Sequence, residues 1–193
     1  PFWNTIIRLG FFLISCILIS EVKRLLLNEQ KLARTDGLTG LLNKQTFIRV
    51  SSQILNLADR HNQTVAIGFI DIDNFKKLND SKGHATGDLA LKMVADTLTR
   101  STRSTDIIGR LGGDEFAVVL PFTSYNESKI IIDKLKSYLE LRALQQRWPI
   151  GFSIGVAIYA TNTPTIDSAL ENADQLMYLV KRAGKDNIIY KEY

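Results

Sequence analysis

The sequence predicts an α/β domain, an α+β sandwich whose central, mostly antiparallel sheet is flanked by helices and preceded by an N-terminal helix. Continuous apolar runs at 64–73 and 149–159 predict buried strands, and amphipathic helical segments alternate with them. In a third stretch, 107–120, two apolar runs meet at Gly-Gly-Asp-Glu and predict a hairpin. A hairpin within this order makes the sheet antiparallel or mixed.

The predicted elements follow one another at short intervals after turn residues at 36–40. Apolar residues recur at helical spacing in the helices, and Thr165 and Gly184 supply start and stop signals for the last helix. In order, the elements are helix 44–59, strand 64–73, helix 87–102, hairpin 107–120, helix 128–144, strand 149–159, helix 165–184 and strand 188–190.

Charge and cysteine content exclude several classes of protein. Residues 1–35 carry a net charge of +3 and residues 36–193 only +1, so the body of the chain has no nucleic-acid-binding footprint. The single cysteine, Cys16, excludes an intramolecular disulfide framework and a cysteine metal cage, which fits a reducing compartment.

Residues 1–20 are largely apolar and are expected to form the end of a transmembrane helix of a longer protein. The uninterrupted run, 9–20, is short of the roughly 20 residues of a spanning helix, so Arg8 would have to reach a membrane face. The basic residues that follow are Lys23, Arg24, Lys31 and Arg34. By the positive-inside rule they place the rest of the chain in the cytoplasm, at the inner membrane. The alternative is a buried or partner-bound soluble helix.

Residues 21–35 continue as a helix without glycine or proline and form a linker to the main domain. Val22, Leu25, Glu29 and Leu32 fall on alternating three- and four-residue steps, the pattern of a coiled-coil stalk. Glu29 on the seam leaves a solvated linker helix as an alternative.

Four carboxylates are expected at one edge of the sheet. Asp71 and Asp73 lie two residues apart at a strand end and so share a face, and Asp114 and Glu115 lie at the hairpin tip. Acids from two distant segments repel each other unless a cation lies between them. Oxygen ligands without nearby His or Cys favour Mg²⁺ or Mn²⁺.

The glycines of the hairpin indicate what else approaches this edge. Gly112 and Gly113 leave the backbone open to a close ligand, typically phosphate oxygens. The basic side chains that could neutralise a polyphosphate are Lys76, Arg110, Lys181 and Lys185. This spacing supports a magnesium–nucleotide site, and the alternative is an exposed acidic turn beside a solvated helix end.

Four stretches resemble, in order and spacing, the GGDEF family of diguanylate cyclases. They are "DGLTGLLNK" (36–44), "DIDNFKKLNDSKGHATGD" (71–88), "GGDEF" (112–116) and "ADQLMYLVKRAGKDN" (173–187). The resemblance covers residues 36–193. It implies a palm-like fold related to adenylyl cyclases and polymerase palms, and a reaction that joins two GTP molecules into cyclic di-GMP with release of two pyrophosphates.

The resemblance also implies roles for the acidic residues. Asp71 and Asp114 match the metal-binding carboxylates, and the main-chain carbonyl of Ile72 matches a third ligand. Strand parity alone nominates Asp73 equally, whereas the family pattern makes Asp73 structural. Glu115 lies beside the metals and is expected to orient or deprotonate the 3′-hydroxyl.

Further positions match residues that bind the substrate. Asn79 and Asp88 match the pair that reads guanine, since a carboxylate accepts from a guanine edge that adenine cannot offer. The lysines at matching triphosphate positions are Lys76, Lys181 and Lys185, the last standing where arginine is usual. Gly112 and Gly113 complete the phosphate-binding turn, and His84 matches a supporting histidine of the nucleotide loop.

The family reaction needs two domains facing each other, so a homodimer is expected, and the product is expected to inhibit. Arg103 and Asp106 match the RxxD motif at which cyclic di-GMP inhibits many diguanylate cyclases. The alternative function is a catalytically silent module of a membrane receptor that binds GTP or cyclic di-GMP.

Overall fold

The computed structural model describes residues 2–32 and 34–193, apart from the side chains of residues 2, 4–7 and 23–32. The chain divides into two compact units, Pro1–Arg34 and Thr35–Tyr193. The second unit carries all of the nominated site residues.

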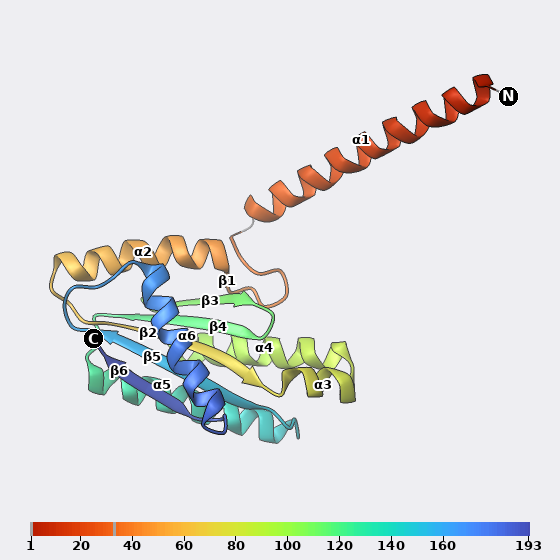
Figure 1. Cartoon of the computed structure of the whole chain (residues 1–193). Coiled ribbons are helices and arrows are strands. Elements are labelled where there is room, and N and C mark those ends of the chain that lie inside the picture. Colours follow the sequence, from red (N-terminus) through yellow and green to blue (C-terminus); the bar gives the residue numbers. More distant parts are fainter. Residues whose placement is uncertain (1, 33) are drawn as a thin grey trace. The chain divides into compact units, whose positions relative to one another are not determined.

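One six-stranded sheet forms the centre of the Thr35–Tyr193 unit (Figure 1). Its strands are β1 (Leu42–Asn43), β2 (Val65–Asp73), β3 (Ile107–Gly112), β4 (Glu115–Pro121), β5 (Gly151–Tyr159) and β6 (Ile188–Glu192). The spatial order is β1-β3-β4-β2-β5-β6. The central pairings are antiparallel, and only the outer strands β1 and β6 pair in parallel. The predicted mostly antiparallel sheet is confirmed.

Helices cover both faces of this sheet (Figure 1). They are α2 (Lys44–Arg60), α3 (Phe75–Lys82), α4 (His84–Ser101), α5 (Tyr125–Gln145) and α6 (Ile166–Arg182). Helices α2 and α6 pack on one face, where Phe47, Leu55 and Met177 meet alternate residues of the strands. Helices α4 and α5 pack on the other face, where Leu98 and Leu135 belong to a second core cluster. Two separate hydrophobic cores therefore hold the central strands rigidly from both sides.

Helix α6 approaches the sheet closely at Gly155. A Cβ atom there would lie 2.1 Å from the carbonyl oxygen of Ala173 and 2.3 Å from the amide nitrogen of Met177. Any larger residue would push α6 away from β5, and α6 carries Lys181 to the end of the sheet.

Two elements differ from the sequence prediction. Strand β1 is only two residues long, too short to leave a periodic pattern. Helix α3 was not predicted, because it is eight residues long and buries only Leu78, which leaves little apolar periodicity in the sequence. This helix matters because it lies between β2 and α4 and carries Lys76 and Asn79.

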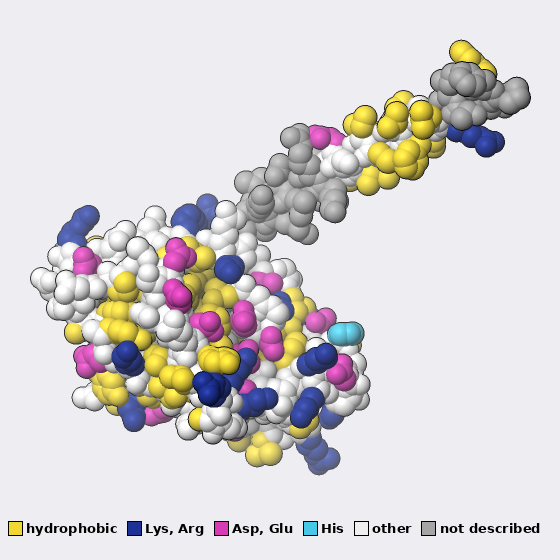
Figure 2. All heavy atoms as spheres, viewed as in Figure 1, with side chains coloured by type: hydrophobic (Ala, Val, Ile, Leu, Met, Phe, Trp, Pro, Cys, Tyr) yellow, Lys and Arg dark blue, Asp and Glu magenta, His cyan; other side chains and the backbone are white. Residues whose placement is uncertain are grey.

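The Pro1–Arg34 unit is one helix, α1 (Phe2–Leu32). Apolar side chains are exposed along its described part, including Phe11 and Ile17 (Figure 2). Among the described residues, no helix is long and apolar enough to span a bilayer. The transmembrane segment expected at 1–20 stays a prediction. The coiled-coil seam proposed for 21–35 lies mostly on side chains outside the described set.

Candidate functional site

The end of β2 and the tip of the β3–β4 hairpin lie side by side. The sheet register pairs Asp71 with Glu115, and the Ile72 amide donates to the Asp114 carbonyl oxygen at 3.3 Å. A cleft of about 360 Å³ opens beside them. Its lining residues are Asp71, Ile72, Asp73, Asn74, Phe75, Lys76, Lys77, Asp80, Asp114, Lys181 and Lys185. The fold thus brings together the nominated metal-binding residues and all three nominated lysines.

Asp71 and Glu115 are held in an environment that disfavours two negative charges. Burial raises the pKa of Asp71, the Lys181 ammonium 2.6 Å away opposes the shift, and Asp114 and Asp73 add to it. Burial likewise raises the pKa of Glu115, and the charges of Asp71 and Asp114 raise it further. Carboxylates with raised pKa values at or beside a cleft are typical of functional sites.

Asp73 differs from Asp71 although both carboxylates are buried. The Ser153 hydroxyl donates to both Asp73 oxygens, at 2.9 and 2.8 Å, and the Asp186 amide donates to Oδ2 at 3.0 Å. These bonds fasten β2 to β5 and to the loop after α6. The hydrogen bonds of Asp73 therefore connect parts of the fold. Asp71 instead forms an ion pair with the flexible Lys181 side chain at the cleft.

Contacts from Arg110 stabilise the tip of the β3–β4 hairpin. Gly113 has φ +36°, a backbone conformation that favours glycine, and its carbonyl oxygen accepts from Arg110 at 2.7 and 3.0 Å. Arg110 also pairs with Asp36 at 3.0 Å. Burial opposes ionisation of Asp36, but hydrogen bonds from Thr39 and Arg110 outweigh it and lower its pKa. Arg110, one of the four cations expected near the phosphates, instead ties the tip to the loop after Arg34.

The proposed guanine-reading pair lies at the junction of α3 and α4. The Asn79 side-chain oxygen is buried and has no hydrogen-bond partner in the described structure. A Cβ atom on Gly87 would lie 1.9 Å from it, so a larger residue there would displace this amide. Asp88 is exposed on α4, in the turn after the first. Both side chains present acceptors, which suits a ligand with adjacent N–H donors.

The remaining nominated residues reach the cleft from two directions. Lys76 enters from α3. Lys185 enters from the loop after α6, and its Nζ donates to Asn74 Oδ1 at 3.3 Å. His84 is exposed at the start of α4. The sequence analysis missed Asn74, Lys77 and Asp80, because the short helix α3 leaves little apolar periodicity.

The cleft offers a small set of hard oxygen donors. No group of three or more His, Cys, Asp or Glu side chains suited to a metal occurs among the described residues. Asp71 and Asp114 nevertheless fit Mg²⁺, which proteins typically hold through one or two carboxylates together with substrate phosphates. The donor chemistry suits a magnesium–nucleotide complex better than a metal held by protein alone.

The family model described as "Diguanylate cyclase, GGDEF domain" matches residues 33–187. The chain belongs to this family. The diguanylate cyclase TpbB of Pseudomonas aeruginosa is 36% identical over 157 residues, which are 79% of this chain and 36% of that protein. The cyclic di-GMP phosphodiesterase NbdA of the same organism is 34% identical over 160 residues, 82% of this chain. This chain spans only 20% of NbdA, so these relatives are much longer proteins.

A solved structure shares the GGDEF fold. It contains the coiled coil and GGDEF domain of DgcB from Caulobacter crescentus in complex with cyclic di-GMP. The TM-score is 0.76 at 27% identity, with 92% of this chain and 95% of that chain covered. The predicted palm-like α/β architecture of the GGDEF domain is confirmed by this likeness.

The nominated inhibitory residues of this GGDEF domain form a tight turn between α4 and β3. The Arg103 amide donates to Asp106 Oδ2 at 2.7 Å, and the Asp106 amide donates to the Arg103 carbonyl oxygen at 3.1 Å. The Arg103 residue is exposed and Asp106 is half-buried. The two residues are adjacent in space, and the Asp106 carboxylate already accepts a hydrogen bond within the turn.

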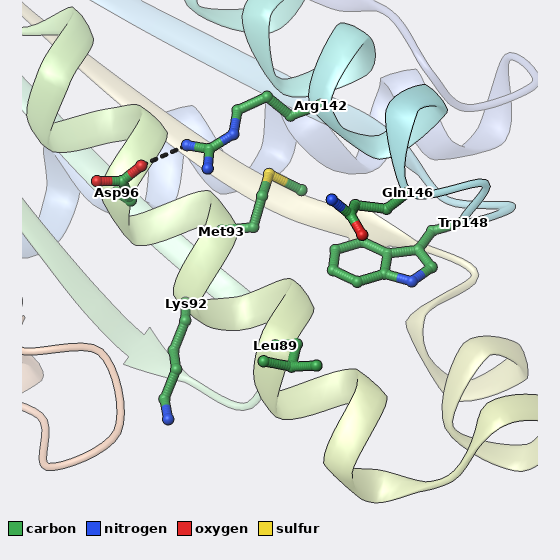
Figure 3. A pocket seen from close by; sticks show the side chains of 7 residues that line it. All are labelled: Leu89, Lys92, Met93, Asp96, Arg142, Gln146 and Trp148. Carbon is green, nitrogen blue, oxygen red and sulfur yellow. Dashed lines mark hydrogen bonds and ion pairs between the residues drawn. The ribbon is translucent and has the colours of Figure 1, made fainter.

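A second hollow of the GGDEF domain lies between α4 and α5 (Figure 3). It is lined by Leu89, Lys92, Met93, Asp96, Arg142, Gln146 and Trp148. An ion pair between Asp96 and Arg142 links the two helices across it. None of the nominated site residues lines this hollow, and both signs of charge occur in it. Both signs of charge are also interspersed on the face of the domain drawn in Figure 2.

Proposed function

We propose that this GGDEF domain condenses two GTP molecules into cyclic di-GMP and releases two pyrophosphates. The observation that carries the proposal is the meeting of Asp71, Asp114 and Glu115 at one end of the sheet, beside Lys181. TpbB, a relative named as a diguanylate cyclase, supports the same reaction.

Asp71, Asp114 and the Ile72 carbonyl oxygen are the groups that would hold Mg²⁺ or Mn²⁺. When bound, such an ion neutralises phosphate charge and makes a bound hydroxyl more acidic. Lys76, Lys181 and Lys185 line the cleft and supply positive charge to the triphosphate.

The role of acting on the attacking hydroxyl is assigned to Glu115. Its pKa is raised by burial and by Asp71 and Asp114, which makes it a stronger base than an exposed glutamate. Its role is to orient the 3′-hydroxyl of one GTP and to accept its proton as the oxygen attacks the α-phosphorus of the other GTP.

Asn79 and Asp88 are assigned the role of selecting guanine over adenine. The buried Asn79 oxygen without a partner and the exposed Asp88 carboxylate are both acceptors, and the N1–H and N2–H₂ edge of guanine offers adjacent donors. Adenine presents an acceptor at N1, so it would leave these oxygens unsatisfied.

Ring closure requires two domains, because each contributes one GTP. We therefore propose an active homodimer in which two copies face each other, paired through the helical segment 21–35. The DgcB structure, described as a coiled coil followed by a GGDEF domain, supports a stalk of this kind. GGDEF domains are cytoplasmic, and we place this one in the same compartment, where GTP is available.

Product inhibition is assigned to Arg103 and Asp106. An arginine can form a bidentate contact with a guanine or a phosphate, and an aspartate can accept from a guanine edge. The DgcB structure, described as a complex with cyclic di-GMP, supports binding of this product to GGDEF domains.

The test is incubation of the purified chain with GTP or ATP and Mg²⁺, with products separated by chromatography. We expect conversion of GTP to cyclic di-GMP, none of ATP to the corresponding product, and loss of activity with a chelator. Equal turnover of ATP would contradict the role of Asn79 and Asp88.

A second candidate function is favoured by NbdA, which matches this chain over one fifth of its length and is named a phosphodiesterase. A GGDEF domain can therefore occur in a protein named for the opposite activity. A chain that binds GTP without forming product under any metal condition would be such a regulatory module.

A further inference from the structure

The loop after α6 has an unusual backbone. Gly184, Lys185 and Asp186 have φ values of +123°, +69° and +49°, so three consecutive residues adopt positive φ. Two of the three carry side chains, for which this conformation is strained. Such a conformation persists only where surrounding contacts hold it in place.

The contacts that hold this loop converge on the Asp186 carboxylate. Its Oδ1 accepts from the Phe152 amide at 3.1 Å and from Lys136 Nζ at 2.9 Å. Gly151 makes room for it, because a Cβ there would lie 2.9 Å from Asp186 Cγ. Strand β5 and helix α5 thus fasten the loop from two sides.

Lys136 is the buried partner in this arrangement. Its side chain is only 11% exposed and also pairs with Glu140, one turn along α5. Burial opposes its charge, but the two carboxylates outweigh burial and raise the pKa of Lys136, and Lys136 in turn lowers the pKa of Asp186. The pair remains ionised at neutral pH, so its hold on the loop is electrostatic as well as geometric.

The fastened loop borders the cleft. The Asp186 amide donates to Asp73 Oδ2 at 3.0 Å, and the residue before it, Lys185, lines the cleft and donates to Asn74 Oδ1. The direction in which Lys185 leaves the loop therefore depends on the backbone that Asp186 holds.

We propose that Lys136 and Asp186 are positioning residues for the triphosphate: they hold the loop at 184–186 in its positive-φ conformation and so aim Lys185 into the cleft. The proposal rests on the proposed function, since it takes Lys185 to contact phosphate. It assigns a role in substrate binding to Lys136, a residue that does not line the cleft.

The test is a double-mutant cycle on GTP affinity, measured by calorimetry in the presence of Ca²⁺ to prevent turnover. The variants are Lys136→Met, Lys185→Met and the double variant, with guanosine as the ligand that lacks phosphates. We expect Lys136→Met to weaken GTP binding about tenfold and to leave guanosine binding unchanged. In the Lys185→Met background, Lys136→Met should cause no further loss, because it acts through Lys185.

Two further variants separate positioning from folding. Lys136→Arg keeps the charge next to Asp186 and should recover most of the GTP affinity. Lys134→Met is the control: Lys134 is exposed on α5, two residues from Lys136, and lies over the Tyr138 ring. This variant should bind GTP as tightly as wild type. Asp186→Asn, which still tolerates positive φ, should resemble Lys136→Met.

The outcomes distinguish this proposal from the proposed function. Wild-type protein that binds no GTP overturns both. Wild-type protein that binds GTP, with additive losses in the double variant or an equal loss of guanosine binding, overturns only the positioning role. A non-additive loss confined to GTP supports it.

Discussion

The cleft and the Arg103–Asp106 turn both place acidic and basic groups together, but by different means. In the cleft, Asp71 and Glu115 come from different strands and Lys181 comes from a helix more than a hundred positions along the chain from Asp71. In the turn, the contacts join residues three positions apart, and the carboxylate is already bonded to the backbone.

This difference implies that the two regions gain different amounts of free energy when they bind a ligand. The cleft holds carboxylates whose pKa values are raised by burial and mutual repulsion, so a cation or a bound nucleotide complex relieves an existing cost. The turn is satisfied as it stands, so a ligand that uses the Asp106 carboxylate must compete with the Arg103 amide. We therefore expect larger effects from changes in the cleft than in the turn.

The largest expected effect comes from Glu115→Gln. The amide keeps the shape of the side chain and removes the base, so the rate of cyclic di-GMP formation should fall by at least about 100-fold. Thermal unfolding should be unchanged or slightly raised. Asp174→Asn serves as the control, because Asp174 acts on Glu115 only through its charge and should change the rate by less than about threefold. If Glu115→Gln formed cyclic di-GMP at the wild-type rate, the proposed role of Glu115 in the reaction would be wrong.

A smaller effect is expected in the turn. Arg103→Ala should raise the concentration of cyclic di-GMP that halves the rate by about tenfold, because a charged contact is lost, and should leave the initial rate unchanged. The measurement is the initial rate against added product. If cyclic di-GMP slows Arg103→Ala and wild type equally, this turn does not bind the inhibitor.

The smallest effect is a change in stability that depends on pH. A carboxyl group with a raised pKa binds its proton more tightly in the folded state, so the free energy of unfolding falls as pH rises from its unfolded pKa through the raised value. Asp114→Asn removes a charge that raises the pKa of Asp71 and Glu115. At pH 7 without metal, it should raise the unfolding temperature by about 2–4 °C, corresponding to roughly 1 kcal/mol.

Asp36→Asn is the control of opposite sign. The pKa of Asp36 is lowered, so the stability it contributes is present above its unfolded pKa and is lost as pH falls through the lowered value. This variant should lower the unfolding temperature at pH 7 and lose its effect in acid. Equal changes for Asp114→Asn at neutral and acidic pH would show that charge repulsion is not the cause.

Much of the fold could be predicted from local pattern. The strands 65–73 and 151–159 are buried along their whole length, as continuous apolar runs predict, and the hairpin meets at the predicted glycines. Helix α3 could not be predicted in this way, because its eight residues bury only Leu78 and so show no apolar period.

The sequence by itself determined the mostly antiparallel sheet, the positions of the acidic residues at its end and the family to which the chain belongs. Strand parity could not separate Asp71 from Asp73, because residues two apart on a strand share a face, and only the family resemblance made Asp73 structural. Only the tertiary structure decided between their surroundings: Ser153, 80 positions away, and the Asp186 amide, 113 positions away, bond to Asp73, while Lys181 pairs with Asp71. Likewise, Arg110 was expected near the phosphates, whereas in the structure it pairs with Asp36, 74 positions away. The physical reason is that periodicity fixes which face a side chain occupies, whereas its partners are set by packing of segments distant in sequence.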